Sequence, residues 1–382
     1  MQHSRQRYFN GLRRSHGKTD VSYAVSCHHY ILIFSRWGTH YDHGNDEVCN
    51  GLVDFAIHKL LGTVEVGKPL SDAQMYAVLS QHLALDIDTL QYLLTLTNPF
   101  MLMETMHEQI ANHMRVCLAV RSGIESLHGV ALSEPILSEA VSHTMSDADI
   151  NFNLPLTLSS VLSGFCINQG ACGELLVAAF FMWARNKVMY SISCPTPMIL
   201  CHHFTVNELF DSLFLGSSLD LILKSPPSLC HQNNSPLPFE DVFKEAHMHF
   251  NHFIKPYERK IISCQYLVHF MAHGVAALGA NCQPGFDAVY PYLYKALDLD
   301  EEKLGFVIVQ VKNDSSFNRT NIDEVFRKMD PFECGLLDKS KMDVLTIPII
   351  RILFLLSSRT VGVERQKYGR PSNGAVTLDK QK

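Results

Sequence analysis

The chain has 382 residues, enough for two domains, and 47% of them are hydrophobic while only 18% are charged. This composition excludes a disordered chain. The net charge is −6, yet the first 20 residues carry five basic side chains and one acid, and residues 312–382 carry thirteen basic and nine acidic ones. Such a distribution excludes a protein that coats nucleic acid along its whole length. A local basic face or two solvated tails both remain open.

The cysteine distribution and the apolar runs indicate an intracellular protein. The 11 cysteines include no CxxC pair, which predicts neither a disulfide framework nor a zinc ribbon and favours a reducing compartment, the cytoplasm or the nucleus. No apolar signal-peptide core is visible near the start. The longest apolar runs, residues 175–184 and 347–356, are too short to cross a bilayer. We therefore expect no membrane partner.

The first part of the chain is predicted to be mostly helical. Residues 1–45 have weak periodicity and stay unassigned, as a disordered segment or the remainder of an upstream domain. In residues 46–150, Ser71 and Gln74 have the spacing of a capping box, and Pro135 suits the first turn of a helix. The apolar stripes that follow predict core packing or a surface for a partner helix. We expect an independent helical unit that contacts a protein partner and carries no chemistry.

The second part, residues 151–364, is predicted to be an α/β or α+β domain with a mixed sheet flanked by helices. Its first helix, around residues 170–184, carries Glu174 in the first turn, where the helix dipole favours an acid. Residues 191–240 are rich in Pro and Ser and predict a long insertion with one short helix near 208–214. The remaining elements are strands at 247–254, 286–294, 304–311 and 347–356, helices at 261–278 and 321–329, and a polar basic tail at 365–382.

Three polar residues stand where two of the predicted strands begin or end. Asp287 opens one strand, and Gln310 and Lys312 close the next, on the same face because side chains alternate along a strand. A hairpin of the two strands would set an acceptor oxygen and an ammonium group side by side. Hydrolysis of a phosphodiester needs a divalent metal, Mg²⁺ prefers oxygen ligands, and a nearby lysine stabilises developing charge. The alternative without chemistry is that Asp287 caps a turn and Lys312 is a solvated charge.

These motifs resemble the PD-(D/E)XK nuclease core. The segment 284–287 followed by Gln310-Val311-Lys312 is similar to the Q-x-K variant of Mrr-type restriction endonucleases, which also have an acid on the preceding helix. The phrases at 173–176, 250–255 and 305–313 resemble the nuclease-like domain of fungal proteins related to Crinkler effectors and mobile-element products. The resemblance covers residues 165–357 and implies a restriction-endonuclease-like sheet.

The resemblance implies a role for each matching residue. Asp287 would be the principal ligand of Mg²⁺ or Mn²⁺, Glu174 a second carboxylate, and Gln310 a carbonyl ligand or a holder of the water. Lys312 would face the attacking water or the scissile phosphate of a DNA or RNA substrate. Two departures bear on activity: Gln310 replaces the acid of the commoner motif, and Cys172 stands where a basic residue is expected. The alternative is a catalytically inactive nuclease fold that binds nucleic acid or protein.

Three histidines form an H-x-H-x-x-H cluster that could suggest a metal site. Along a single strand, His247 and His249 would share one face and His252 would lie on the other. That arrangement separates the ligands, so we expect surface or core imidazoles here.

Overall fold

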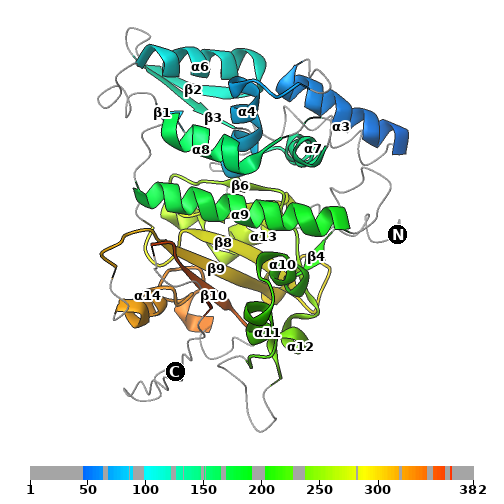
Figure 1. Cartoon of the computed structure of the whole chain (residues 1–382). Coiled ribbons are helices and arrows are strands. Elements are labelled where there is room, and N and C mark those ends of the chain that lie inside the picture. Colours follow the sequence, from blue (N-terminus) through cyan, green and yellow to red (C-terminus); the bar gives the residue numbers. More distant parts are fainter. Residues whose placement is uncertain are drawn as a thin grey trace.

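The protein is of the mixed α/β class, as the sequence predicts. The computed structural model describes residues 46–62, 68–85, 87–88, 99–121, 126–131, 133–147, 150, 152–164, 169–191, 203–226, 237–280, 283–317, 321–341, 347–357 and 362–363. Helix α9 (Gln169–Ser191) lies between a mostly helical N-terminal layer and a seven-stranded mixed sheet (Figure 1). Among these residues, no helix has the length and hydropathy needed to cross a membrane. The predictions for residues 1–45 and 365–382 lie outside the described residues.

The N-terminal layer contains five helices among its described residues and a small sheet. The Ser71–Gln74 capping box is confirmed, because each side chain bonds the other residue's backbone N–H. The antiparallel sheet, in the order β1-β3-β2, is a feature that the helical periodicity did not predict. The elements are α3 (Asp46–Leu61), α4 (Asp72–Leu83), β1 (Ile87–Asp88), α6 (Pro99–Asn112), β2 (Val116–Arg121), β3 (Ser126–Val130), α7 (Pro135–Ser146) and α8 (Leu154–Gly164).

This layer shares its core with the rest of the protein. Tyr76 and Leu79 of α4 and Met106 of α6 belong to the same buried apolar cluster as α9 and the main sheet. The reason is that α9 is apolar nearly all round, so it buries one side against the sheet and another against the N-terminal helices. The shared core differs from the independent unit expected from separate apolar stripes.

The main sheet has a central antiparallel pair, β8 and β9, in which Ala288 lies opposite Val309. β10 pairs with β9 in parallel, and the path continues from β8 through β5 to β4. The strands are β4 (Phe204–Thr205), β5 (Ala246–Met248), β6 (His252–Ile254), β7 (Val275–Leu278), β8 (Ala288–Tyr294), β9 (Leu304–Lys312) and β10 (Ile350–Leu355).

One side of β8 is divided between two neighbours. Its first residues pair with β7, where Leu278 lies opposite Ala288, and its last residues pair with β5, where Ala246 lies opposite Tyr294. β7 pairs in turn with β6 in parallel. As a result β6, β7, β9 and β10 all end, and β8 begins, at one edge of the sheet. We call this the strand-end edge.

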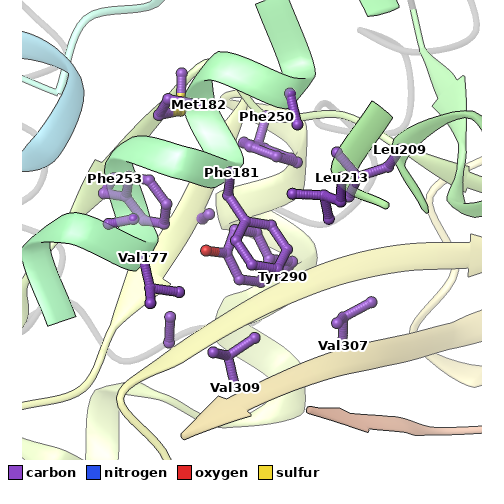
Figure 2. Close-up of a cluster of buried hydrophobic side chains, with 14 of the residues drawn as sticks. Val177, Phe181, Met182, Leu209, Leu213, Phe250, Phe253, Tyr290, Val307 and Val309 are labelled. Atoms are coloured by element: carbon purple, nitrogen blue, oxygen red, sulfur yellow. The ribbon is translucent and has the colours of Figure 1, made fainter. Parts of the chain in front are cut away.

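Each face of the sheet has its own core. On the α9 face, Phe181 stacks on Tyr290 with ring centroids 4.3 Å apart, above Val307 and Val309 (Figure 2). On the other face, Ile308 and its neighbours pack against helix α13 (Cys264–Ala272). The further helices are α10 (Val206–Leu213), α11 (Ser217–Leu223), α12 (Phe239–Phe243), α14 (Ile322–Lys328) and 3-10 turns at Arg259–Ile261, Glu301–Lys303 and Lys339–Lys341.

Two predicted elements are wrong in their boundaries. The single strand expected at 247–254 is two strands, β5 and β6, which have different partners. The helix expected at 261–278 stops at Ala272, because the chain turns at Gly274 with a φ of +67° and continues as β7. In both cases a short turn without Pro interrupts an apolar stretch.

The described part of the predicted insertion at 191–240 belongs to the fold. Phe204 in β4 and Leu209 in α10 are 1% and 0% exposed, and β4 completes one edge of the main sheet. The one short helix expected there is present as α10, and α11 and α12 accompany it. Residues 192–202 and 227–236 lie outside the described residues.

Candidate active site

Asp287 and Gln310 lie on neighbouring strands at the strand-end edge, which confirms their predicted juxtaposition. The Gln310 Nε2 and the Val311 backbone N–H both donate to the Asp287 Oδ2, at 2.5 and 2.6 Å. The Asp287 N–H donates to the Val309 carbonyl at 2.8 Å. Upstream, Gly285 has a φ of +88°, and a Cβ there would collide with the Lys328 carbonyl oxygen. Only glycine therefore fits the turn that delivers Asp287 to β8.

Glu174 reaches the same edge from α9. The helix begins at Gln169, so Glu174 lies in its second turn, whereas the sequence predicts the first turn. The helix dipole therefore does not explain an acid at this position, because the effect of the dipole fades within the first turn. The start of the helix packs closely on the end of β9. Asn313 Nδ2, just after β9, donates to the Gln169 carbonyl at 2.8 Å. A Cβ at Gly173 would lie 2.8 Å from the Asn313 Cβ.

The two carboxylates are both harder to ionise than usual. Burial and, to a smaller extent, the charge of Asp287 raise the pKa of Glu174 to about 6, and Lys255 and Lys312 oppose the shift. Burial likewise raises the pKa of Asp287, against the Val311 N–H, Lys312, Gln310 and Lys255. The charge of Asp287 acts on Glu174. Two carboxylates and two ammonium groups form one electrostatic cluster.

Lys255 is the member of this cluster that the sequence analysis missed. It directly follows β6 and precedes Pro256, which ends the strand. A lysine closing a short apolar strand is the same signal that drew attention to Lys312. In the part of the chain that the structure describes, both lysines are half-buried and neither belongs to an ion pair.

The side chains present offer oxygen ligands to a metal. Within the described ranges, no group of three His, Cys, Asp or Glu side chains could hold a metal ion. The strand-end edge offers two carboxylates, Asp287 and Glu174, and the amide oxygen of Gln310. Mg²⁺ usually takes only one or two protein carboxylates and keeps several waters, so this set fits Mg²⁺ or Mn²⁺.

Within the described ranges, the three histidines form no metal site. His252 is 0% exposed in β6, with its ring nitrogens 2.8 Å from the Ser133 Oγ and 2.7 Å from the Asn251 Oδ1. Burial is the largest cause that lowers the pKa of His252 to about 3, so this ring is a neutral imidazole in the core. Cys172 is half-buried in α9, and burial raises the pKa of its thiol. The position expected to be basic therefore carries a neutral group.

A separate hollow of about 330 Å³ lies between α10, α11 and the last turns of α9. Glu208, Asp211 and Glu240 line it beside Val188 and Leu223. Three carboxylates repel a phosphate, so the strand-end edge and not this hollow is the candidate active site.

Compared with known proteins, the chain matches no family model, no curated protein and no solved structure. The resemblance to PD-(D/E)XK nucleases thus stays a hypothesis carried by short motifs. The functional argument depends on the geometry and charges at the strand-end edge.

Proposed function

We propose that this protein is a metal-dependent nuclease that hydrolyses phosphodiester bonds in DNA or RNA at the strand-end edge. The observation that carries the proposal is the cluster itself: Asp287 hydrogen-bonded to Gln310 at 2.5 Å, with Glu174 close enough for the charge of Asp287 to raise its pKa and Lys312 close enough to act on both carboxylates. Perturbed ionisable groups that converge at strand ends are a common mark of catalytic sites.

Each side chain has a distinct task in this proposal. Asp287, Glu174 and the amide oxygen of Gln310 would hold Mg²⁺ or Mn²⁺. The bound metal would stabilise negative charge on the phosphate and lower the pKa of water. The amide of Gln310 fixes the orientation of the Asp287 carboxylate through its hydrogen bond. Lys312 stabilises the charge that develops on the phosphate oxygens in the transition state.

The test is cleavage of labelled single- and double-stranded DNA and RNA with and without a chelator. Asp287→Ala should lower cleavage by at least roughly 10²-fold, since it removes the principal metal ligand. Asp298→Ala is the matched control, because Asp298 is an exposed acid that follows the C-terminal end of β8, whereas Asp287 precedes its N-terminal end. Cutting that persists in chelator, or an Asp287→Ala variant as active as wild type, would contradict the proposal.

Two further variants separate metal binding from chemistry. Lys312→Ala should leave the Mg²⁺ affinity largely intact yet lower cleavage by roughly 10²-fold, the effect of losing one charge-stabilising group. Gln310→Glu restores the commoner motif and should tighten metal binding, because it adds a negative charge. Isothermal calorimetry with Mn²⁺ and single-turnover cleavage measure the two effects on the same preparations.

One observation favours a second candidate, a nuclease-like fold that binds without cutting. The Asp287 Oδ2 already accepts two hydrogen bonds, and two lysines balance the charge of two carboxylates. Both features weaken attraction for a cation. Calorimetry with Mg²⁺ and Mn²⁺ on wild type and on Asp287→Ala decides between the candidates: identical, negligible heats for both proteins favour the binding protein.

A further inference from the structure

The sheet register brings Lys255 to the same level as Asp287. β6 and β7 are parallel with Ile254 opposite Ala277, and β7 lies against β8 with Leu278 opposite Ala288. The Gly279 N–H, one residue further, donates to the Asp287 carbonyl at 2.8 Å. Lys255 therefore stands beside the end of β7, two strand spacings from β8, or roughly 10 Å between backbones.

Lys255 and Lys312 approach Asp287 from opposite sides. β9, which carries Lys312, adjoins β8 on one side, and β6 lies beyond β7 on the other. Three strand spacings separate the two lysine backbones, roughly 14 Å. Both ammonium groups nonetheless lie near enough to Glu174 and Asp287 to lower the pKa values of these carboxyl groups.

Lys255 is half-buried, and its charge acts on Glu174 and Asp287. In the described ranges no carboxylate forms an ion pair with it. The rest of its strand is anchored in the core, since Phe253 is 2% exposed beneath α9. The lysine is thus held at the edge with its charge available to a ligand.

We propose that Lys255 is a second phosphate-binding residue, which holds a phosphodiester next to the one at Lys312. The inference rests on the proposed nuclease function and narrows its substrate to a nucleic-acid strand with successive phosphates. We expect a lone phosphodiester at the metal site to engage Lys312. A strand that crosses the edge engages both.

The experiment measures binding and cleavage of Lys255→Met, which keeps the length of the side chain and removes its charge. Lys303→Met is the matched control, because Lys303 is exposed just before β9, roughly 30 Å along the strand from Lys312. The dissociation constant for a short labelled DNA or RNA strand is measured in chelator between about 50 and 200 mM salt. Bis(p-nitrophenyl) phosphate serves as the substrate with a single phosphodiester.

We expect Lys255→Met to reduce the slope of log affinity against log salt by about 0.7–0.9, the loss of one phosphate contact, while Lys303→Met does not. Its KM for the strand should rise more than its KM for bis(p-nitrophenyl) phosphate, while the loss of its charge near Glu174 and Asp287 should change kcat by the same factor on both substrates. Lys255→Arg should keep the wild-type slope.

An unchanged salt slope in Lys255→Met overturns the inference, and so does an equal rise in KM for both substrates. The second result would place Lys255 at the reacting phosphate. If wild type cleaves neither substrate, the proposed nuclease function fails, while the salt slope still decides whether Lys255 holds a phosphate.

Discussion

Helix α9 carries two groups of charged residues with opposite character. In the C-terminal third of the helix, Arg185 Nη2 lies 3.0 Å from Glu139 Oε2 of α7, and the two side chains are 1% and 3% exposed. Arg185 Nη1 also donates to the Ser142 Oγ and the Asn186 Oδ1, each at 3.0 Å. Near its start, Glu174 shares the strand-end edge with Asp287 and two lysines that have no ion pair in the described part of the chain.

The difference separates structural charges from functional ones. A fully buried charge must be paired, since an uncompensated one costs several kcal/mol, so the Arg185–Glu139 pair joins α7 to α9. Half-buried charges without ion pairs contribute little to the free energy of unfolding and can interact with a ligand. Removing one partner of the pair should therefore strongly destabilise the protein, and removing a charge from the edge should not.

The largest expected effect is that of Arg185→Ala, which leaves Glu139 buried without its partner. We expect the free energy of unfolding to fall by about 3–5 kcal/mol. Lys312→Met, at the strand-end edge, should change it by less than about 1 kcal/mol. Urea denaturation followed by circular dichroism measures both values.

A double variant tests the cause of that loss. Arg185→Met with Glu139→Leu removes both charges and should recover most of the stability, because no buried charge is left unpaired. If the double variant is as unstable as Arg185→Ala, packing and not charge explains the loss.

A second expected effect concerns acid. His82, fully buried, has its Nε2 3.0 Å from the Ser138 carbonyl, and burial lowers its pKa to about 3 with a smaller contribution from Arg185. The unfolded chain takes up this proton below about pH 6.5 and the folded chain does not, so stability is lost as pH falls from 6.5 toward 3. At about pH 5 the loss from this one group is about 2 kcal/mol.

His82→Gln should remove that part of the acid sensitivity. The measurement is the free energy of unfolding in urea at about pH 7.5 and pH 5. His58→Gln, an exposed histidine of α3, is the control and should behave as wild type. An equal loss between the two pH values in His82→Gln and wild type would show that His82 is not the sensitive group.

Two helical glycines give the last comparison, in which Gly51→Ala has the smallest expected effect. A Cβ at Gly51 of α3 would meet nothing within 4 Å, so Gly51→Ala should stabilise the protein by about 0.5–1 kcal/mol. At Gly173 the same Cβ would lie 2.8 Å from the Asn313 Cβ and 3.2 Å from Val311. Overpacking of that kind costs about 1–3 kcal/mol and outweighs the helix propensity gained.

Gly173→Ala should also lower cleavage, because the shifted helix start carries Glu174 away from Asp287. Thermal unfolding and the cleavage assay are measured on both variants. A Gly173→Ala protein that is stabilised as much as Gly51→Ala would mean that α9 is not tightly seated on the end of β9.

The sequence predicts the pairing of Asp287 with Gln310, because this pairing depends on local periodicity. Alternation along 304–311 gives the faces of β9, and a hairpin with the preceding strand sets Asp287 beside Gln310. Both features are confirmed. The capping box at Ser71 and the strand at 347–356 follow from equally local rules, although β10 is shorter than predicted.

The remaining features depend on contacts between distant segments. β6 has three residues, too few to show a period, so its separation from β5 and the place of Lys255 become evident only from its pairing with β7. The turn at Gly274 is fixed by Asn251 and His249, whose side chains lie within 3.2 Å of where its Cβ would be. The role of α9 as a shared core element likewise needs both layers in place.

The order of the strands has a consequence for how this protein is synthesised. β10 begins roughly 40 residues after β9 ends, although the two are neighbours in the sheet. At ~5–20 residues per second, the ribosome leaves one edge of β9 unpaired for several seconds. β9 is apolar on both faces, so in that interval a second nascent chain can add a strand to it. Pairing with β10 therefore closes the edge of β9 to such an addition.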